Sequence, residues 1–452
     1  MAKKAKKLHS SKGAKLEIVN PDAAGIDIAD TELQVCVPAD RDAENNRRFG
    51  SFTVDLCFIS GWLKACHITT VAMEATGIYW IPLFLKLQSD GFDVILTNAR
   101  DIKNISEKKT DESDAEWIML LHSYGLLKAS FQPNDFARTI RNLSRHRNNL
   151  QQEASKAVLH QQKALEQMNI KLTTVISDIL GSSGQAIIHA ILAGNHDPEA
   201  LALLVDPRCK ASREDIVKSL EGTWDEDHLF ELKQCVDQYR FFLGQIAACD
   251  EKIEQLMETY ASKVDMDMVD FVRTGKAVCK KNATSIDAEK FGFAIWGVNL
   301  MEIPGISKNT VLQLIGELGH DFVEKFDSPS KFCRWCNIVP NTKISGGKVL
   351  SSRVPRKKNP VGQILRVCAN TLSHSKDELG CYFRRMKARG GYNQAIVATA
   401  HKLAKIIYVM VRDKVPYDAT KIGPGEEELL KRKIESTQRA LDRLKSKLSN
   451  AA

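Results

Sequence analysis

Residues 25–29 read Gly-Ile-Asp-Ile-Ala, which places the carboxylate of Asp27 inside a short apolar stretch. An apolar run of this length with branched side chains is typical of a buried β-strand. A carboxylate in such a strand is unfavourable unless a positive charge compensates it. The stretch therefore predicts a central strand that also carries part of a functional site.

Strand-like and helix-like patterns alternate around this stretch over the first 130 residues. Strands are predicted at residues 24–37, with a bend near Asp30, and at 47–54, 68–74 and 92–97. Helices are predicted at residues 55–66, with Asp55 as N-cap, and at 77–88 and 113–124. The alternation predicts an α/β layer with a mixed sheet.

Three further acidic residues complete a candidate metal site. Glu74 ends the apolar strand at residues 71–74, and Asp111 and Asp114 lie three residues apart, on one helix face. Oxygen ligands of this number suit Mg²⁺ or Mn²⁺, and two such ions can flank a scissile phosphate. The carboxylates follow one another on the first strand, on a later strand and on a helix, which is the order of an RNase H-like layout. A turn cap at Asp27 and a helix N-cap at Asp111 are the structural alternatives.

The middle and the end of the chain are predicted to be helical. Residues 139–174 contain no proline or glycine, and residues 236–263 have a second long helical pattern. An antiparallel hairpin, a coiled coil and a packed bundle are all compatible with them. The final helix has a stripe of residues spaced four and three apart, suitable for a partner helix: Leu430, Ile434, Thr437, Leu441, Leu444 and Leu448.

A basic segment without acidic residues extends from Ser328 to Lys376 and predicts nucleic-acid binding, because phosphate backbones attract such segments. Its cationic residues are Lys331, Arg334, Lys343, Lys348, Arg353, Arg356, Lys357, Lys358, Arg366 and Lys376.

Two short glycine-containing motifs lie in this region. In the loop Ile-Ser-Gly-Gly-Lys at residues 344–348, Gly346 and Gly347 expose Ser345 and leave room for a phosphate. From the loop alone, a phosphate-contacting hydroxyl is favoured over a catalytic serine. Upstream, Pro304 and Gly305 resemble a helix-hairpin-helix turn that presents backbone N–H groups to DNA; a plain tight turn is the alternative.

Composition narrows the class of protein. The net charge is +8, and six lysines among the first 15 residues predict a disordered basic arm at residues 1–20 rather than a secretory signal. No run of about 18 apolar residues is present, so no membrane segment is expected. Eleven scattered cysteines are typical of buried, reduced thiols in a cytoplasmic protein. The close pair Cys333 and Cys336 has no second pair nearby and favours packing over zinc binding.

Together, these motifs resemble the IS110/IS1111 family of bacterial transposases over nearly the whole chain. Gly-Ile-Asp27-Ile-Ala, Met-Glu74-Ala-Thr-Gly and Asp111-Glu-Ser-Asp114 are similar to the family's Asp-Glu-Asp-Asp signature. The C-terminal Ile-Pro-Gly-Ile motif and the loop around Ser345 follow in the family's order.

The resemblance implies an α/β RNase H/RuvC-like domain at residues 21–138 and a helical coiled-coil region at 139–295. Next would come a mainly α transposase domain at residues 296–415, which contains the serine loop, and then a helical tail at 416–452.

The resemblance also implies a chemistry. Asp27, Glu74, Asp111 and Asp114 would bind Mg²⁺, and Ser345 would form a covalent phosphoserine link to DNA, in a site completed by another protomer. The implied partners are donor and target DNA, a structured guide RNA that pairs with both, and further copies of the chain, as dimers that assemble into a tetramer. The competing hypotheses are a RuvC-like nuclease or junction resolvase that uses water as nucleophile, and a binding protein that has lost the chemistry.

Overall fold

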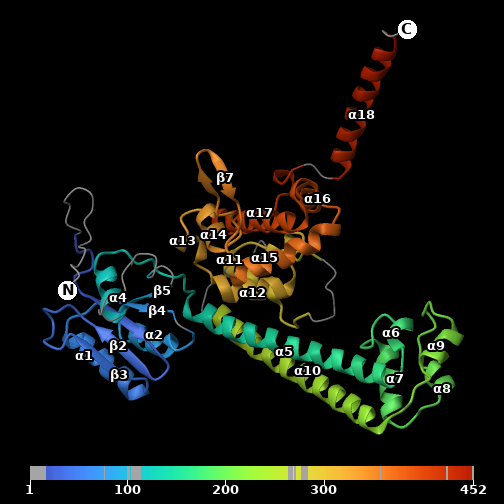
Figure 1. Cartoon of the computed structure of the whole chain (residues 1–452), viewed down its shortest axis with the longest axis horizontal. Coiled ribbons are helices and arrows are strands. Elements are labelled where there is room, and N and C mark those ends of the chain that lie inside the picture. The colour runs from blue at the N-terminus through green and yellow to red at the C-terminus, as the bar shows by residue number, and fades with distance from the viewer. Residues whose placement is uncertain are drawn as a thin grey trace, which may run out of the picture. The chain divides into compact units, whose positions relative to one another are not determined.

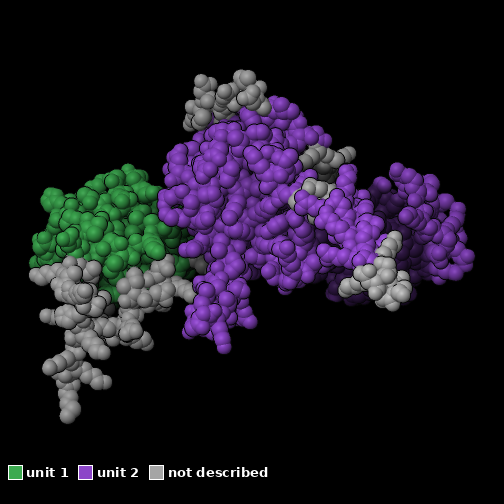
Figure 2. Space-filling view, turned by 90° about the horizontal axis from the view of Figure 1, so that it is seen from above, with its two compact units in different colours: residues 1–132 green, residues 133–452 purple. Residues whose placement is uncertain are grey.

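The computed structural model describes residues 17–75, 77–98, 102, 114–262, 268, 271–275, 283–356, 358–423 and 426–449. The chain divides into two compact units, residues 1–132 and 133–452, which Figure 2 shows in different colours. The first contains a five-stranded sheet, and the second is mainly helical (Figure 1). The predicted boundaries after residues 138, 295 and 415 stay predictions, and most of the predicted basic arm lies outside the described residues.

A mixed sheet forms the centre of the N-terminal unit. Its strands are β1 (Ala23–Ile28), β2 (Glu32–Cys36), β3 (Asn46–Gly50), β4 (Thr70–Glu74) and β5 (Asp93–Thr97). They lie in the order β3-β2-β1-β4-β5. Strand β2 is antiparallel to β1 and β3, whereas β1, β4 and β5 are parallel to one another. The predicted mixed sheet is confirmed.

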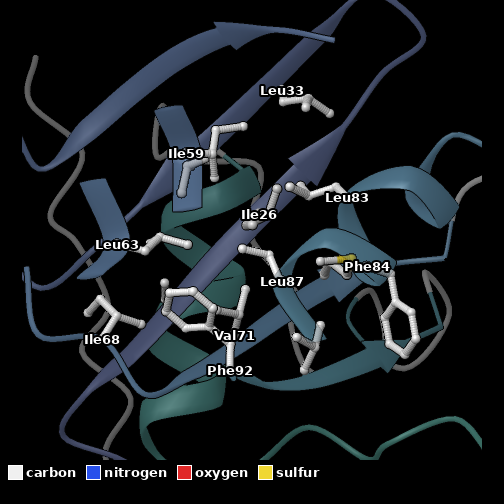
Figure 3. Close-up of a cluster of buried hydrophobic side chains, with 14 of the residues drawn as sticks. Ile26, Leu33, Ile59, Leu63, Ile68, Val71, Leu83, Phe84, Leu87 and Phe92 are labelled. Carbon is white, nitrogen blue, oxygen red and sulfur yellow. The ribbon is translucent and has the colours of Figure 1, made fainter. Parts of the chain in front are cut away.

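The larger core of this unit lies between one face of the sheet and two helices, α1 (Thr53–Ala65) and α2 (Trp80–Ser89). Figure 3 shows Ile26 of β1 among side chains from both helices, such as Leu63 and Leu87. All three are fully buried. Burial of each such side chain contributes about 1.5–3 kcal/mol relative to exposure.

Helix α1 begins before the predicted start at Asp55. Phe52 is the N-cap, and the Asp55 side chain, in the first turn, accepts a hydrogen bond from the Phe52 N–H at 3.0 Å. The prediction of Asp55 as N-cap is therefore wrong. An acidic residue three positions after the N-cap closes the helix start equally well, which is the acidic half of a capping box.

Helix α4 (Asp114–Ser123) covers the other face of the sheet. Its backbone lies so close to β1 that a Cβ added at Gly25 would be 2.2 Å from the Met119 nitrogen and 2.3 Å from the Ala115 carbonyl oxygen. A glycine inside a strand commonly marks such a close backbone approach. Gly25 therefore permits the direct packing of α4 on β1.

Two long helices, α5 (Asp135–Gln167) and α10 (Glu226–Ala261), form an antiparallel pair in the C-terminal unit (Figure 1). Phe136 in the first turn of α5 stacks on Tyr260 in the last turn of α10, with ring centroids 3.9 Å apart. Both helices begin earlier than predicted, α5 because Asn134 caps it by accepting from the Ala137 N–H. The predicted hairpin is present, and its description as a coiled coil stays a prediction.

A buried ion pair crosses this helix pair. Arg147 donates through Nε and one terminal nitrogen to the two carboxylate oxygens of Asp250, at 2.5 and 3.0 Å. Asp250 also accepts from the Thr284 hydroxyl at 3.0 Å and the Ser285 N–H at 3.2 Å. Arg147 and Asp250 are both 4% exposed. The pair therefore joins the helical hairpin to the segment that leads into the following helices.

Four short helices lie between α5 and α10 in the sequence and gather at the far end of the pair (Figure 1). They are α6 (Leu172–Val175), α7 (Ser182–Leu192), α8 (Pro198–Ala202) and α9 (Arg213–Ser219). Their apolar side chains share one core with the ends of α5 and α10.

Helix α17 (Tyr392–Asp413) contacts four helices that precede it in the chain, α13 to α16. The α-helices before it are α11 (Ala288–Trp296), α12 (Lys308–Leu318), α13 (Phe322–Lys325), α14 (Pro329–Trp335), α15 (Pro360–Thr371) and α16 (Glu378–Gly390). The 3-10 turns are η1 (Leu300–Glu302), η2 (Leu372–His374) and η3 (Ala419–Lys421).

Among the described helices, α17 alone is long and apolar enough to pass a test for a membrane span. Half of its most apolar window is buried by the rest of the protein. Tyr408, for example, is 1% exposed and donates through its hydroxyl to the Phe326 carbonyl oxygen. Helix α17 is therefore apolar because it packs in the core of the unit.

The predicted final helix is present as α18 (Glu426–Ser449). Leu430, Ile434 and Leu441 of the predicted stripe are exposed. A partner helix for this stripe stays a prediction.

The ten described cysteines are unpaired, as expected for reduced thiols. Cys57 is exposed, so its prediction as a buried thiol is wrong. Cys333 and Cys336 are fully buried, and burial raises the pKa of the Cys333 thiol to about 11. Within the described ranges no group of three His, Cys, Asp or Glu side chains is spaced to hold a metal ion.

Candidate active site

The ends of two neighbouring parallel strands bring Asp27 and Glu74 together. Ile26 of β1 pairs with Met73 of β4, so that Asp27 and Glu74 are the next residues of the two strands. Equivalent residues of adjacent strands point to the same face of a sheet. For Asp27 this is also the face of Gly25, two residues earlier, on which α4 packs.

Asp114, the first residue of α4, lies on the same side of the sheet. Asp27 is half-buried and Asp114 is exposed. Burial raises the pKa of the Asp27 carboxyl, and the negative charges of Asp114 and then Glu74 raise it further. The Ile28 N–H opposes them by donating to Asp27 Oδ1 at 3.0 Å. The charges of two predicted carboxylates, Asp114 and Glu74, therefore act on a third, Asp27.

The oxygen chemistry of this grouping suits a divalent cation, but Asp27, Glu74 and Asp114 are not spaced to hold one in this structure. The charged neighbours that shift the pKa of Asp27 are both acidic, so that a bound cation would lower the free energy of the ionised group. Carboxylate oxygens are the ligands that Mg²⁺ and Mn²⁺ prefer. The fourth predicted ligand, Asp111, lies outside the described residues.

Ser345 lies at the tip of a hairpin in the C-terminal unit, formed by β6 (Lys343–Ser345) and β7 (Lys348–Ser351). Gly346 and Gly347 connect the strands with φ angles of 55° and 75°. Two left-handed residues in a two-residue connection make the type I′ turn, which matches the twist of a hairpin. The turn pairs Ser345 directly with Lys348 across the strands, and both are exposed.

Further predicted phosphate ligands lie in this hairpin or follow it closely in the sequence. Lys343, Arg353, Arg356 and Lys358 are exposed. The Asn341 N–H donates to the Arg353 carbonyl oxygen at 2.9 Å, which extends the hydrogen-bonding of the hairpin beyond its strands. Lys357 lies outside the described residues.

The motif with Pro304 and Gly305 forms the turn between η1 and α12. Gly305 has a φ of 82°, and a Cβ added there would lie 3.1 Å from the Cys368 carbonyl oxygen of α15. Backbone conformation and internal packing thus already account for the glycine. Binding of DNA phosphate by this turn stays a prediction.

Two family models match separate segments of the chain. The family model for IS110-type DEDD transposases, described as "Transposase", matches residues 24–170. A second model, described as "Transposase IS116/IS110/IS902 family", matches residues 298–383. The chain belongs to the IS110 family of transposases. No curated protein gives a significant match over this chain.

Membership in the IS110 family shows what kind of protein this is. The N-terminal unit of the transposase has an RNase H-like fold, and its substrate is DNA. The first match includes Asp27, Glu74, Asp111 and Asp114, and the second includes Ser345. All the predicted catalytic residues therefore lie in the segments that carry the similarity.

The structure of the transposase adds two features that the sequence interpretation missed. Gly25 allows the helix of Asp114 to approach the strand of Asp27, and the sequence signal was a glycine inside a strand. Ile344, Val349 and Leu350, beside the predicted nucleophile, are 62–68% exposed. The sequence holds no signal for this exposure, because the same residues would also suit a half-buried strand.

Proposed function

We propose that this IS110-family transposase exchanges DNA strands through a phosphoserine intermediate on Ser345, guided by a structured RNA. The observation that carries the proposal is the exposure of Ser345 on a two-glycine turn, paired with Lys348, within the segment from Ser328 to Lys376 that lacks acidic residues. A backbone phosphate can reach the serine there and remain beside cations.

The proposed step conserves the energy of the phosphodiester. Ser345 Oγ bonds to the scissile phosphorus as the bond from phosphorus to one deoxyribose oxygen breaks. The serine proton leaves to solvent, and the released deoxyribose oxygen takes up a proton. Attack by the hydroxyl of a second strand reverses the sequence and frees the serine, so no external energy source is required. Lys348 and Arg353 stabilise negative charge on the phosphate.

We assign the metal site of this reaction to Asp27, Glu74, Asp111 and Asp114. Bound there, Mg²⁺ or Mn²⁺ would orient the scissile phosphate and offset its developing charge. The carboxylates would supply ionised oxygens to the ion, although burial and then the charges of Asp114 and Glu74 raise the pKa of Asp27. The ends of β1 and β4 and the first turn of α4 carry Asp27, Glu74 and Asp114.

RNA guidance and assembly complete the proposal. Family resemblance and the exposed basic residues around the hairpin support a guide RNA that pairs with donor and target DNA. The same resemblance supports dimers that join into a tetramer, in which Ser345 of one protomer meets the carboxylates of another.

A covalent-trapping experiment tests the chemistry. The full chain is incubated with Mg²⁺, RNA transcribed from the non-coding end of its own element and labelled DNA that spans the joined element ends, and is then denatured. We expect a protein–DNA adduct that maps to the peptide containing Ser345. Ser345→Ala and Asp27→Ala should abolish it, whereas Ser351→Ala, at the other end of the hairpin, should retain it. Omission of the RNA should also abolish the adduct.

The alternative outcomes are distinct. Cleavage without an adduct that survives Ser345→Ala but not Asp27→Ala would establish the hydrolytic nuclease. An adduct that forms equally well without RNA would reject RNA guidance but leave the serine mechanism intact. Mixing the two inactive variants, Ser345→Ala and Asp27→Ala, should restore part of the adduct if different protomers supply the serine and the carboxylates. An inactive mixture would reject that shared site.

A further inference from the structure

The hairpin that carries Ser345 has two chemically different faces. Side chains alternate between the faces of a strand, and directly paired residues share a face. Ser345 and Lys348 form one such pair, and Ile344 and Val349 form the next. The polar pair therefore lies on one face and the aliphatic pair on the other, one residue away from the proposed nucleophile.

The aliphatic face has no cover within its own unit. Ile344 is 63% exposed and Val349 is 62% exposed. The register shifts between Lys343 and Ile344, which leaves Leu350 as an extra residue on β7, and it is 68% exposed. In Figure 1 the hairpin projects from the helices around it. An isolated two-stranded hairpin is only marginally stable in water, and a cluster of exposed aliphatic groups commonly marks an interaction site.

The charge around the hairpin identifies the chemistry of the occupant. Lys343 and Lys348 lie in the hairpin strands, and Arg353, Arg356 and Lys358 follow closely in the sequence. All five are exposed, and the segment they belong to contains no acidic residue. A protein partner with an apolar surface alone would leave these cations without counter-charges. A nucleic acid supplies both surfaces, because its phosphates are anionic and its bases present apolar faces once they are unstacked.

We propose that Ile344 and Val349 form a wedge that enters the base stack of DNA beside the scissile phosphate and unstacks one base step. The proposal rests on the proposed role of Ser345 and extends it. Ser345 and Ile344 are consecutive residues, about 3.3 Å apart along the strand, and their side chains point to opposite faces of the hairpin. With the Ser345 face at the phosphate, the opposite face with Ile344 and Val349 is free to contact the adjacent bases. Their burial between bases offsets the cost of unstacking.

The wedge allows a strand to leave its complement for exchange. A strand that remains stacked and paired cannot join a new partner, even after its backbone has been cut. Apolar side chains fixed to the nucleophile hairpin couple opening of the duplex to the arrival of Ser345 at the phosphate. The same two strands then determine which phosphate is attacked and which base step opens.

The test uses variants that retain the shape of the hairpin. Threonine is β-branched, like isoleucine and valine, but carries a hydroxyl, so that Ile344→Thr/Val349→Thr should preserve the strands while weakening insertion. The matched control is Val367→Thr on α15, where the valine is 66% exposed. Each change is made in the full chain, both with Ser345 and in a Ser345→Ala background that cannot form an adduct.

The first readout is unstacking without chemistry. DNA with 2-aminopurine at the cleavage site is bound by the Ser345→Ala protein with RNA and Mg²⁺, and its fluorescence should increase severalfold. The increase should disappear with Ile344→Thr/Val349→Thr and persist with Val367→Thr, at protein concentrations that saturate binding in a mobility-shift assay. Equal fluorescence with the threonine pair would overturn the wedge.

The second readout is rescue by DNA that is already open. With Ser345 present, Ile344→Thr/Val349→Thr should form the adduct about tenfold more slowly on paired DNA. A mismatch at the cleavage step should restore the rate. If the mismatch gives no rescue, or if the variants change the oligomeric state rather than the DNA, the aliphatic face binds something else and the proposal is wrong. Absence of an adduct in the unmodified protein would reject the serine mechanism, while the fluorescence would still test the wedge.

Discussion

Replacement of Gly25 by alanine should separate the strand of Asp27 from the helix of Asp114. The added Cβ would lie 2.2 Å from the Met119 nitrogen, whereas ordinary contact begins near 3.4 Å. Because the obstructing atoms belong to the backbone of α4, no side-chain rotation relieves the clash. The helix and the strand must therefore move apart by about 1.2 Å at this point.

The displacement should affect catalysis more than folding. Overpacking of this kind typically costs about 1–3 kcal/mol of stability. The same movement separates Asp27, two residues along β1, from Asp114, in the first turn of the displaced helix. A misplacement of about 1 Å in a catalytic constellation can lower the rate roughly 100-fold. We therefore expect Gly25→Ala to remain folded at low temperature and to form the DNA adduct about 100-fold more slowly.

Single-turnover adduct formation, measured with saturating Mg²⁺ and DNA, gives this rate directly. Gly61→Ala is the matched control, because Gly61 lies in helix α1 of the same unit and an added Cβ there meets nothing within 4 Å. That variant should react at the unmodified rate. Gly25→Ala with an unchanged rate and an unchanged melting temperature would show that α4 does not need this approach, and the reasoning would be refuted.

Two further predictions concern buried polar groups. Asp250→Ala should leave the buried Arg147 without its partner, which costs about 3–5 kcal/mol of stability and should accelerate amide hydrogen exchange in α10. The apolar pair Arg147→Met/Asp250→Leu should recover most of the protection. Unchanged exchange in Asp250→Ala would contradict the prediction. Burial lowers the pKa of His122 below 6.5, so the folded chain binds a proton less readily than the unfolded chain and stability is lost as pH falls below about 6.5. The melting temperature of His122→Asn should therefore fall less between pH 7.5 and 5.5 than that of the unmodified protein. An equal fall in the two proteins would contradict this.

The sequence was most informative where one residue conflicts with its surroundings. Asp27 in an apolar strand is such a conflict, because burial of a carboxylate has a large free-energy cost that neighbouring groups must offset. The strand, its central position and the nearby Glu74 and Asp114 were predictable for this reason. Binding of metal by these groups stays a prediction.

Contacts between distant segments were not predictable in the same way. Periodicity shows which face of a helix is apolar, but not which element meets that face. Arg147 and Asp250 are 103 residues apart, and each lies in a mainly polar helix where an exposed position was the simpler expectation. Their burial follows only from the antiparallel register of α5 and α10, which the stacking of Phe136 on Tyr260 also shows.

The serine hairpin is the opposite case to the strand of Asp27, because neither its strands nor the exposure of its aliphatic residues was predicted. Only a glycine-containing loop was predicted at residues 344–348, and the structure forms two strands around the two glycines. Strands of that composition are normally half-buried, yet Ile344 and Val349 remain in solvent. Composition alone does not reveal such an exposed pair, since the same letters describe a strand within a core.

The two parts of the proposed site have different structural requirements. Carboxylates that share a metal ion must stay together against their mutual repulsion, so they require fixed backbone, which paired strands and the contact of α4 with Gly25 provide. A nucleophile that meets a large, variable substrate requires access, which an exposed two-residue turn at Ser345 provides. A hairpin with uncovered aliphatic side chains also gains stability when DNA covers them. Binding of the correct substrate would therefore order the nucleophile, and the Ile344→Thr/Val349→Thr protein should lose that ordering together with the opening of the duplex.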